Sequence, residues 1–193
     1  MIKHEVQHPL LKQHIKFFWE IKADYMRLNH KIIPVRNIDL KFNLSDTSHY
    51  LKVNDNKHLL EDVYFSGLQD HFRNAQILLD GKVHVIGVCF YPQGFYPFLK
   101  MPLSEIKNQL LGADEVGFHQ ARTICYKLKE AKDTETRLYI LENELLTHYD
   151  SSLQTPEAFI HLFNSLQQSD NSFELTEFSR KNNIGIRKLE RMF

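Results

Sequence analysis

Residues 172–193 read SFELTEFSRKNNIGIRKLERMF, and this stretch predicts two short helices around a tight turn. Asn183 suits the turn, because asparagine tolerates a positive φ better than other residues that carry a side chain. Gly185 is an acceptable N-cap for the second helix, on which Leu189 and Phe193 share an inward face. The pattern is typical of a helix-turn-helix, whose second helix is suited to the major groove of DNA.

The opposite face of this second helix is basic. From residue 179 to 193 the acidic residue Glu190 stands alone among five basic ones, whereas the whole chain balances 24 Lys and Arg against 24 Asp and Glu. A short charge run by itself is as often a solvated helix face. Its phasing with the apolar positions favours the DNA-binding interpretation. The residues expected to contact double-stranded DNA are Ile186, Arg187, Lys188 and Arg191.

This stretch resembles the first helix-turn-helix of AraC-type transcriptional regulators. The positions that fit the pattern of that family are Arg187, Leu189, Glu190, Arg191 and Phe193. The departures are Ser179 at the usual Ala, Asn183 at the usual turn Gly and Gly185 at the usual N-cap Ser. The DNA-binding unit of the family has two such motifs joined by a long helix. Because the first motif alone is present, the resemblance implies a chain that is truncated within its DNA-binding domain.

The preceding residues 1–150 predict a β-rich domain that ends in helices. Residues 38–44 alternate apolar and polar side chains with the period of a half-buried strand. Asp80-Gly81, between two apolar runs, predicts the tight turn of a hairpin. Helices are expected at 104–111, 118–131 and 134–149. Strands followed by helices predict an α+β fold, and residues 151–193 then form a second, all-α unit with the partial helix-turn-helix.

Residues 8–150 resemble the β-rich sensor-side domain that precedes the DNA-binding unit in a subset of AraC-type regulators. The landmarks are Pro9, Phe18-Trp19, the runs 32–44 and 87–99, and Gly67. Such domains are commonly cupin-like β-barrels, so the resemblance implies a cupin-like barrel here. It also implies a small-molecule effector and a homodimer, for which the helices from 118 to 149 offer a face.

Aromatic side chains near Pro- and Gly-rich backbone suggest a ligand pocket in the β-rich half. Arg36 is the most distinctive candidate, because a guanidinium binds a carboxylate through two parallel hydrogen bonds. We therefore expect Arg36→Ala to weaken the binding of an anionic effector. An aromatic residue on an alternating strand position is nevertheless more often part of the core. The candidate ligand-binding residues are Trp19, Arg36, Asp39, Phe90 and Phe95.

Patterns for catalysis or metal binding do not stand out in the sequence. The chain has 11 histidines but lacks the His-x-His pair of catalytic cupins, and metal sites need several converging ligands. His84, alone in an apolar run, is expected to be packed or exposed. Phosphate-binding loops and nucleophile elbows are also absent from the sequence. We expect no enzyme, no catalytic residue, no metal and no cofactor.

Cys89 and Cys125 stand in apolar contexts and are expected to be buried free thiols. The sequence shows neither a signal peptide nor the ~20 apolar residues of a membrane helix. These features predict a cytoplasmic protein. Two functions remain: a DNA-binding regulator that responds to an effector, and a ligand-binding or protein-interaction module that does not bind DNA on its own.

Overall fold

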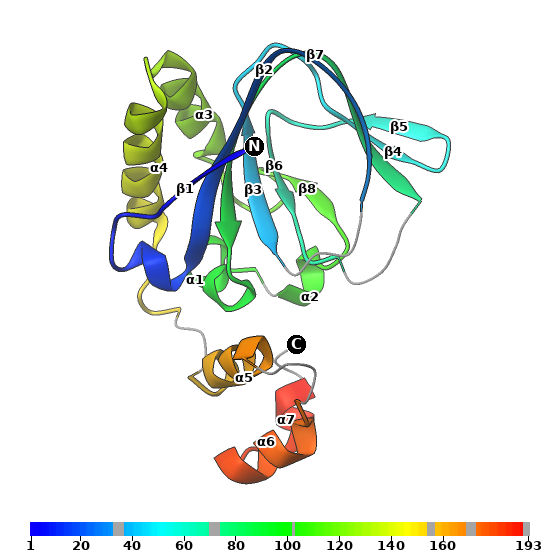
Figure 1. The fold of residues 1–193 in the computed structure, drawn as a ribbon. Coiled ribbons are helices and arrows are strands. Elements are labelled where there is room, and N and C mark those ends of the chain that lie inside the picture. Colours follow the sequence, from blue (N-terminus) through cyan, green and yellow to red (C-terminus); the bar gives the residue numbers. More distant parts are fainter. Residues whose placement is uncertain (33–36, 70–73, 102, 154–156, 169–172, 191–193) are drawn as a thin grey trace.

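The computed structural model describes residues 1–32, 37–69, 74–101, 103–153, 157–168 and 173–190 of the chain. An eight-stranded antiparallel sheet occupies the N-terminal half, and helices follow it (Figure 1). The fold is therefore α+β, as the sequence predicts. The strands are β1 (Ile2–His4), β2 (Ile15–Lys31), β3 (Ile38–Asn43), β4 (Tyr50–Val53), β5 (Asn56–Leu59), β6 (Val63–Ser66), β7 (Ala75–Phe90) and β8 (Leu110–Gly112). The helices are η1 (Leu11–Gln13), η2 (Pro92–Gly94), α1 (Tyr96–Leu99), α2 (Leu103–Ile106), α3 (Ala121–Glu130), α4 (Thr134–His148), α5 (Glu157–Gln168), α6 (Leu175–Asn182) and α7 (Ile186–Glu190).

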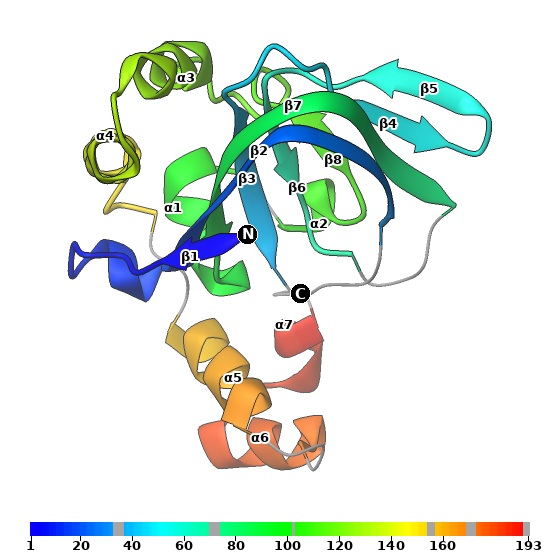
Figure 2. The same cartoon turned by 45° about the horizontal axis from the view of Figure 1, so that its top comes forward.

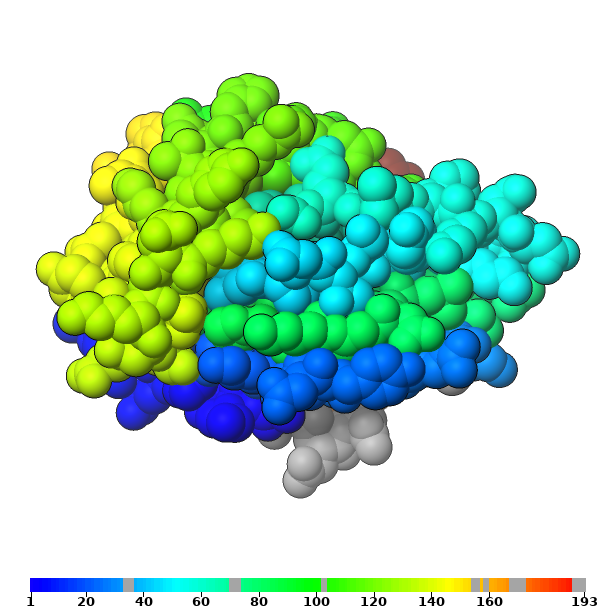
Figure 3. Space-filling model, turned by 90° about the horizontal axis from the view of Figure 1, so that it is seen from above, coloured from blue at the N-terminus to red at the C-terminus, as the bar shows by residue number. Residues whose placement is uncertain are grey.

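The two longest strands, β2 and β7, give the sheet its shape. The strand order is β1-β2-β7-β3-β6-β8, and the β4–β5 hairpin pairs with the first half of β7. In Figure 2 the paired β2 and β7 arch over the shorter strands. Seen from above, helices α3 and α4 gather at one end of the adjacent β2 and β7 bands (Figure 3).

The hairpin predicted at Asp80-Gly81 is wrong, because β7 runs through this dipeptide without turning. Gly81 has a φ of 144°, a conformation that favours glycine. It pairs with Met26, next to a break in the register of β2. Since β2 is as long as β7, the backbone groups of this dipeptide bond across the ladder instead of closing a turn.

The helix predicted at 104–111 is also wrong beyond its first turn. Helix α2 ends at Ile106, and Asn108 follows with a φ of 58°. The next residues form β8, in which Leu111 pairs with Phe65 of β6. An added Cβ at Gly67 would overlap the carbonyl group of Ile106, so a glycine is needed where α2 meets the sheet.

The predicted helices 118–131 and 134–149 correspond to α3 and α4. Asp133 is the N-cap of helix α4, and its carboxylate accepts a hydrogen bond from the N–H of Thr136 at 2.8 Å. Both helices, together with α1, cover one face of the sheet and complete the main core. Its fully buried large side chains include Phe18, Leu40, Phe42, Phe65, Ile86, Phe90, Phe95 and Ile124.

A hydrogen-bonded network also holds α4 on this face of the sheet. Oε1 of Glu20 lies 2.8 Å from Nε2 of His84, and Oε2 accepts a hydrogen bond from the Thr134 hydroxyl at 2.7 Å. His84 is therefore packed, one of the two outcomes that its apolar surroundings suggest. Burial raises the pKa of Glu20, but the bonds from His84 and Thr134 together outweigh it and leave the pKa lowered.

Helices α5 and α6, with the turn that follows α6, have a small core of their own. Leu162 of α5 and Phe178 of α6 form its buried centre, and Leu166, Phe173 and Ile184 pack around it. Figure 1 shows α5, α6 and α7 below the sheet, where α5 lies against η2. Helices α5 and α6 thus share a hydrophobic cluster distinct from the main core.

Candidate functional site

Helices α6 and α7 are two short helices joined by a tight turn. Helix α6 ends at Asn182, and Asn183 adopts the left-handed conformation, with φ 52° and ψ 41°. The turn residue predicted from the sequence is thereby confirmed. Helix α7 starts at Ile186, and the carbonyl oxygen of Gly185 accepts a hydrogen bond from the N–H of Lys188 at 2.9 Å.

Two hydrogen bonds between Ser179 and Ile184 fix the turn. The hydroxyl of Ser179 donates to the carbonyl oxygen of Ile184 at 2.6 Å, and the N–H of Ile184 donates to the carbonyl oxygen of Ser179 at 3.1 Å. Ser179 replaces the usual Ala of the AraC-type pattern, and its hydroxyl supplies a link that alanine lacks. Phe178 meanwhile anchors α6 on Leu162 of α5.

Cationic side chains point to solvent from this unit. Arg180 of α6 is exposed, as are Arg187 and Lys188 of α7. Ile186 is half-buried, so its side chain is better placed to pack α7 against the rest of this unit than to reach far into a DNA groove. Arg191, the remaining residue expected at the DNA, lies outside the described residues.

Trp19 and Asp39, two of the expected ligand-binding residues, meet on the sheet face opposite α3 and α4. We call it the Trp19 face; its members are Trp19, Asp39, Lys41, Tyr64 and Cys89. The indole Nε1 donates a hydrogen bond to Oδ1 of Asp39 at 2.9 Å. The indole crosses β7 at Gly87, where a Cβ would overlap the ring. This glycine therefore lets a side chain of β2 reach β3 across the strand between them.

Lys41 brings a positive charge to the same face. It pairs with Gly87 of β7 on one side and Tyr64 of β6 on the other. Its Nζ lies 5.4 Å from the centroid of the Tyr64 ring, a cation–π distance. Burial lowers the pKa of Lys41, an effect that the negative charge of Asp39 opposes. Among the described residues, Lys41 has no hydrogen bond or ion pair with an acidic side chain.

His49 lies next to Tyr64 of the Trp19 face. Its Nδ1 lies 3.4 Å from the Tyr64 hydroxyl, and burial lowers the pKa of the imidazole. The Nε2 atom of His49 is buried without a hydrogen-bond partner in the described structure. Burial also raises the pKa of Tyr64. The face therefore combines aromatic walls with one half-buried ammonium group.

Phe90 and Phe95 do not join this site. Both are fully buried in the main core on the other face of the sheet, with ring centroids 5.7 Å apart. Alternation along β7 accounts for the position of Phe90, which points away from its neighbour Cys89. Arg36, the remaining ligand-binding candidate, lies outside the described residues.

Lys41 and Tyr64 are functional candidates that the sequence did not single out. Lys41 occupies a polar position of an alternating strand, a pattern that usually marks the solvent side. Lys41 is nevertheless half-buried, between neighbouring strands and against the ring of Tyr64. The burial of such a position depends on tertiary contacts, which leave no local signal in the sequence.

The described residues contain neither a group of side chains that could bind a metal nor a helix that could span a membrane. No three His, Cys, Asp or Glu side chains of these residues gather into a group that could hold an ion. Each helix of the described structure is too short or too polar to span a bilayer. The two cysteines are buried free thiols, as predicted.

Comparison with known proteins places the sheet-bearing half in a family. Residues 6–112 match a family model described as "Domain of unknown function (DUF6597)". No curated protein matches the chain. A similar solved structure is ToxT from Vibrio cholerae O395, with a TM-score of 0.39 and 11% identity over 91% of this chain and 73% of that one. A similarity this weak supports no conclusion about function.

Proposed function

The chain belongs to the DUF6597 family, and we propose that it is a DNA-binding transcriptional regulator of AraC type. The α6–α7 unit carries this proposal, because it has the left-handed Asn183 between two helices and a cationic second helix. The residues that fit the AraC-type pattern support the same interpretation. In this role α7 enters the major groove, where Arg187 and Lys188 contact bases or phosphates.

A comparison of two lysine variants tests this proposal. Lys188→Ala removes an exposed cation from α7, whereas Lys22→Ala removes one from β2, far along the chain from the helix-turn-helix. Fluorescence anisotropy with the upstream region of the gene measures the affinity of each variant across a salt series. If Lys188 contacts a phosphate, its loss weakens binding and lowers the slope of log K against log [salt] by about one.

The control variant should bind as the parent protein does. Equal affinities and equal salt slopes for Lys188→Ala and Lys22→Ala would contradict the role given to α7. If neither variant nor the parent protein binds the duplex, the chain is a ligand-binding or interaction module that does not bind DNA on its own.

We further propose that the Trp19 face binds the effector, in a sensor domain of the cupin-like kind. An anionic group would pair with the ammonium of Lys41, which lacks an acidic partner in the described structure. The Trp19 and Tyr64 rings would flank the apolar part of the ligand. The chemistry favours an aromatic carboxylate, the class of ligand for which the sequence also proposes Arg36.

Trp19 is the single tryptophan of the chain, so its fluorescence reports directly on this face. We expect benzoate to change that fluorescence in a saturable way, and Lys41→Met to weaken the apparent affinity about tenfold or more. Arg36→Ala should act in the same direction. An unchanged affinity in Lys41→Met, with the fold intact by circular dichroism, would rule out this site.

The proposed regulator acts without catalysis or a cofactor, in the cytoplasm, as a homodimer formed through α3 and α4. The outward faces of these helices carry Tyr126 and Tyr139, each 70% exposed. Large exposed aromatic residues are enriched at protein interfaces. Sedimentation velocity should then show that Tyr139→Asp shifts the protein from dimer to monomer. A parent protein that sediments as a monomer at high concentration would contradict the proposed dimer.

A further inference from the structure

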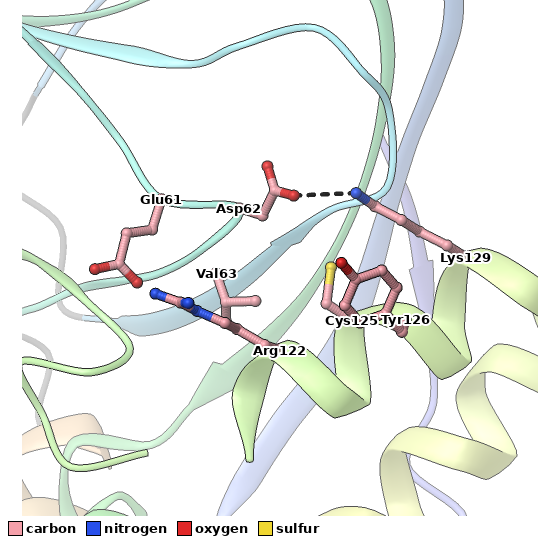
Figure 4. Close-up of a pocket in the computed structure, with 7 residues that line it drawn as sticks. All are labelled: Glu61, Asp62, Val63, Arg122, Cys125, Tyr126 and Lys129. Carbon is pink, nitrogen blue, oxygen red and sulfur yellow. Dashed lines mark hydrogen bonds and ion pairs between the residues drawn. The ribbon is translucent and has the colours of Figure 1, made fainter. Parts of the chain in front are cut away.

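A pocket of about 220 Å³ lies between the start of β6 and helix α3 (Figure 4). Its strand side is formed by Glu61, Asp62 and Val63, and its helix side by residues of one stripe of α3. Val63 and Tyr64 point to opposite faces of the sheet. The pocket is therefore separate from the Trp19 face and its proposed effector.

The floor of the pocket is apolar and uncharged. Val63 and Cys125 are 2% and 4% exposed. The thiol of Cys125 donates to the carbonyl oxygen of Asn43 at 3.5 Å, and burial raises its pKa to about 11. The group is thus a neutral thiol at physiological pH, and the floor accepts an apolar ligand group.

Four charged side chains surround this floor, and three of them already have a partner. Lys129 Nζ lies 3.0 Å from Oδ2 of Asp62. Arg122 Nη2 lies 2.8 Å from Oδ2 of Asp114, which is next to the pocket. A guanidinium has five N–H donors, so this single bond leaves Arg122 able to bind a second carboxylate.

Glu61 is the acidic group without a partner at the mouth of the pocket. It makes no hydrogen bond or ion pair with the other described residues. Its carboxylate lies against Gly112, where an added Cβ would overlap it. Figure 4 shows the carboxylate of Glu61 and the guanidinium of Arg122 directed toward one another. The pocket therefore presents both a guanidinium and a carboxylate to a small ligand.

We propose that this pocket binds a free α-amino acid with a small apolar side chain. The α-carboxylate pairs with Arg122, the α-ammonium pairs with Glu61, and the side chain lies on Val63 and Cys125. Tyr126 of α3 borders the pocket.

The mixture of charges explains why the ligand must be a zwitterion. A simple carboxylate would meet Glu61 and Asp62 as well as Arg122, and like charges in close contact are unfavourable. A simple amine would meet Arg122 and Lys129. A molecule that carries both charges on one carbon satisfies both sides of the mouth at once.

A titration of the protein with three ligands of similar shape, without DNA, tests this proposal. L-valine carries both charges, 3-methylbutanoate lacks the ammonium group, and 2-methylpropylamine lacks the carboxylate. Amide chemical shifts in a two-dimensional NMR spectrum give the affinity and the location. We expect valine to bind at least tenfold more tightly than either analogue, with shifts concentrated at residues 61–63 and 122–129.

Two charge-neutralising variants then assign the roles. In Glu61→Gln the preference for valine over 3-methylbutanoate should disappear, and in Arg122→Gln the preference over 2-methylpropylamine should disappear. Arg27→Gln, which removes a similarly exposed ion pair with Asp80, should leave both preferences unchanged. A purely structural role of Glu61 would lower thermal stability without changing this discrimination.

The proposal is overturned if valine causes no localised shifts, if both analogues bind as well as valine does, or if Glu61→Gln keeps the preference. Because the measurement contains no DNA and no aromatic carboxylate, each of these results leaves the DNA-binding and effector proposals intact.

Discussion

At the scale of single residues, Gly87 decides the geometry of the Trp19 face. Without a side chain at this position the indole of Trp19 lies across β7 and bonds to Asp39 at 2.9 Å. The interaction joins three neighbouring strands. A glycine within a strand usually weakens it, but here the close approach of another group requires one.

Gly87→Ala should therefore displace the indole and lower the free energy of unfolding by about 1–3 kcal/mol. The Trp19 emission should shift to longer wavelength, since the displaced ring meets more water. Urea denaturation followed by Trp19 fluorescence measures both effects. Gly117→Ala provides a contrast, because Gly117 has no atom within 4 Å of an added Cβ but has a φ of 72°. Gly117→Ala should lower the stability through backbone strain alone, so its Trp19 emission should match that of the parent protein. An unshifted Trp19 emission in Gly87→Ala would contradict the packing of the indole against Gly87.

The sequence could identify Trp19 and Asp39 as candidates but not their contact. Their partnership depends on the register of two strands against β7, which pairs residues far apart along the chain. Lys41 was missed because alternation marks its position as polar without saying whether that face is covered. Residue type was thus predictable, and burial on the second face was not.

At the scale of secondary-structure elements, the Glu20 network fastens α4 to the sheet. Glu20 of β2 holds His84 of β7 and Thr134 at the start of α4. Arg137 of α4 in turn donates from Nε to the carbonyl oxygen of Leu128 at 3.0 Å, near the end of α3. Two helices and two strands are therefore joined by buried polar groups, and loss of one group leaves the others unsatisfied.

This network makes stability depend on pH. The pKa of Glu20 is lowered from 4.5 in the folded protein, so its contribution is present above pH 4.5 and is lost as the pH falls through the folded value. Glu20→Gln should lower the free energy of unfolding at pH 7 by about 1–3 kcal/mol and flatten its acid dependence. Chemical denaturation between pH 7 and 3 measures this.

Glu135→Gln is the matched control, since Glu135 is exposed in the first turn of α4. Its acid dependence should follow that of the parent protein. If Glu20→Gln retained the full decline in stability between pH 5 and 3, the carboxylate would not be the group that titrates.

Predictions of elements succeeded where the pattern was local. The period of β3, the helix at 134–149 and the left-handed Asn183 all depend on neighbouring residues. The Asp80-Gly81 turn and the helix at 104–111 failed because partner strands decided them. Asp80 pairs with Arg27 of β2, and Leu110 pairs with Ser66 of β6. Long-range pairing of this kind overrides turn and helix propensities.

At the scale of the whole molecule, the proposed functions are divided between the part of the chain around the main core and the C-terminal helices. The sheet with α3 and α4 carries the two proposed ligand sites on its opposite faces. The three C-terminal helices carry the exposed cations Arg180, Arg187 and Lys188. With a net charge of zero, the chain as a whole does not attract nucleic acid, so the proposed DNA binding would rely on this local charge and on base contacts.

The most direct test of this account is the sequence preference of DNA binding by the protein expressed from its complete coding frame. Anisotropy would compare the upstream region of the gene with a scrambled duplex of the same composition, across a salt series. We predict tighter binding to the upstream region by about a thousandfold or more, with a steep loss of affinity as salt rises. Equal affinity for both duplexes, or no binding even at low salt, would contradict the assignment of this chain as a sequence-specific regulator.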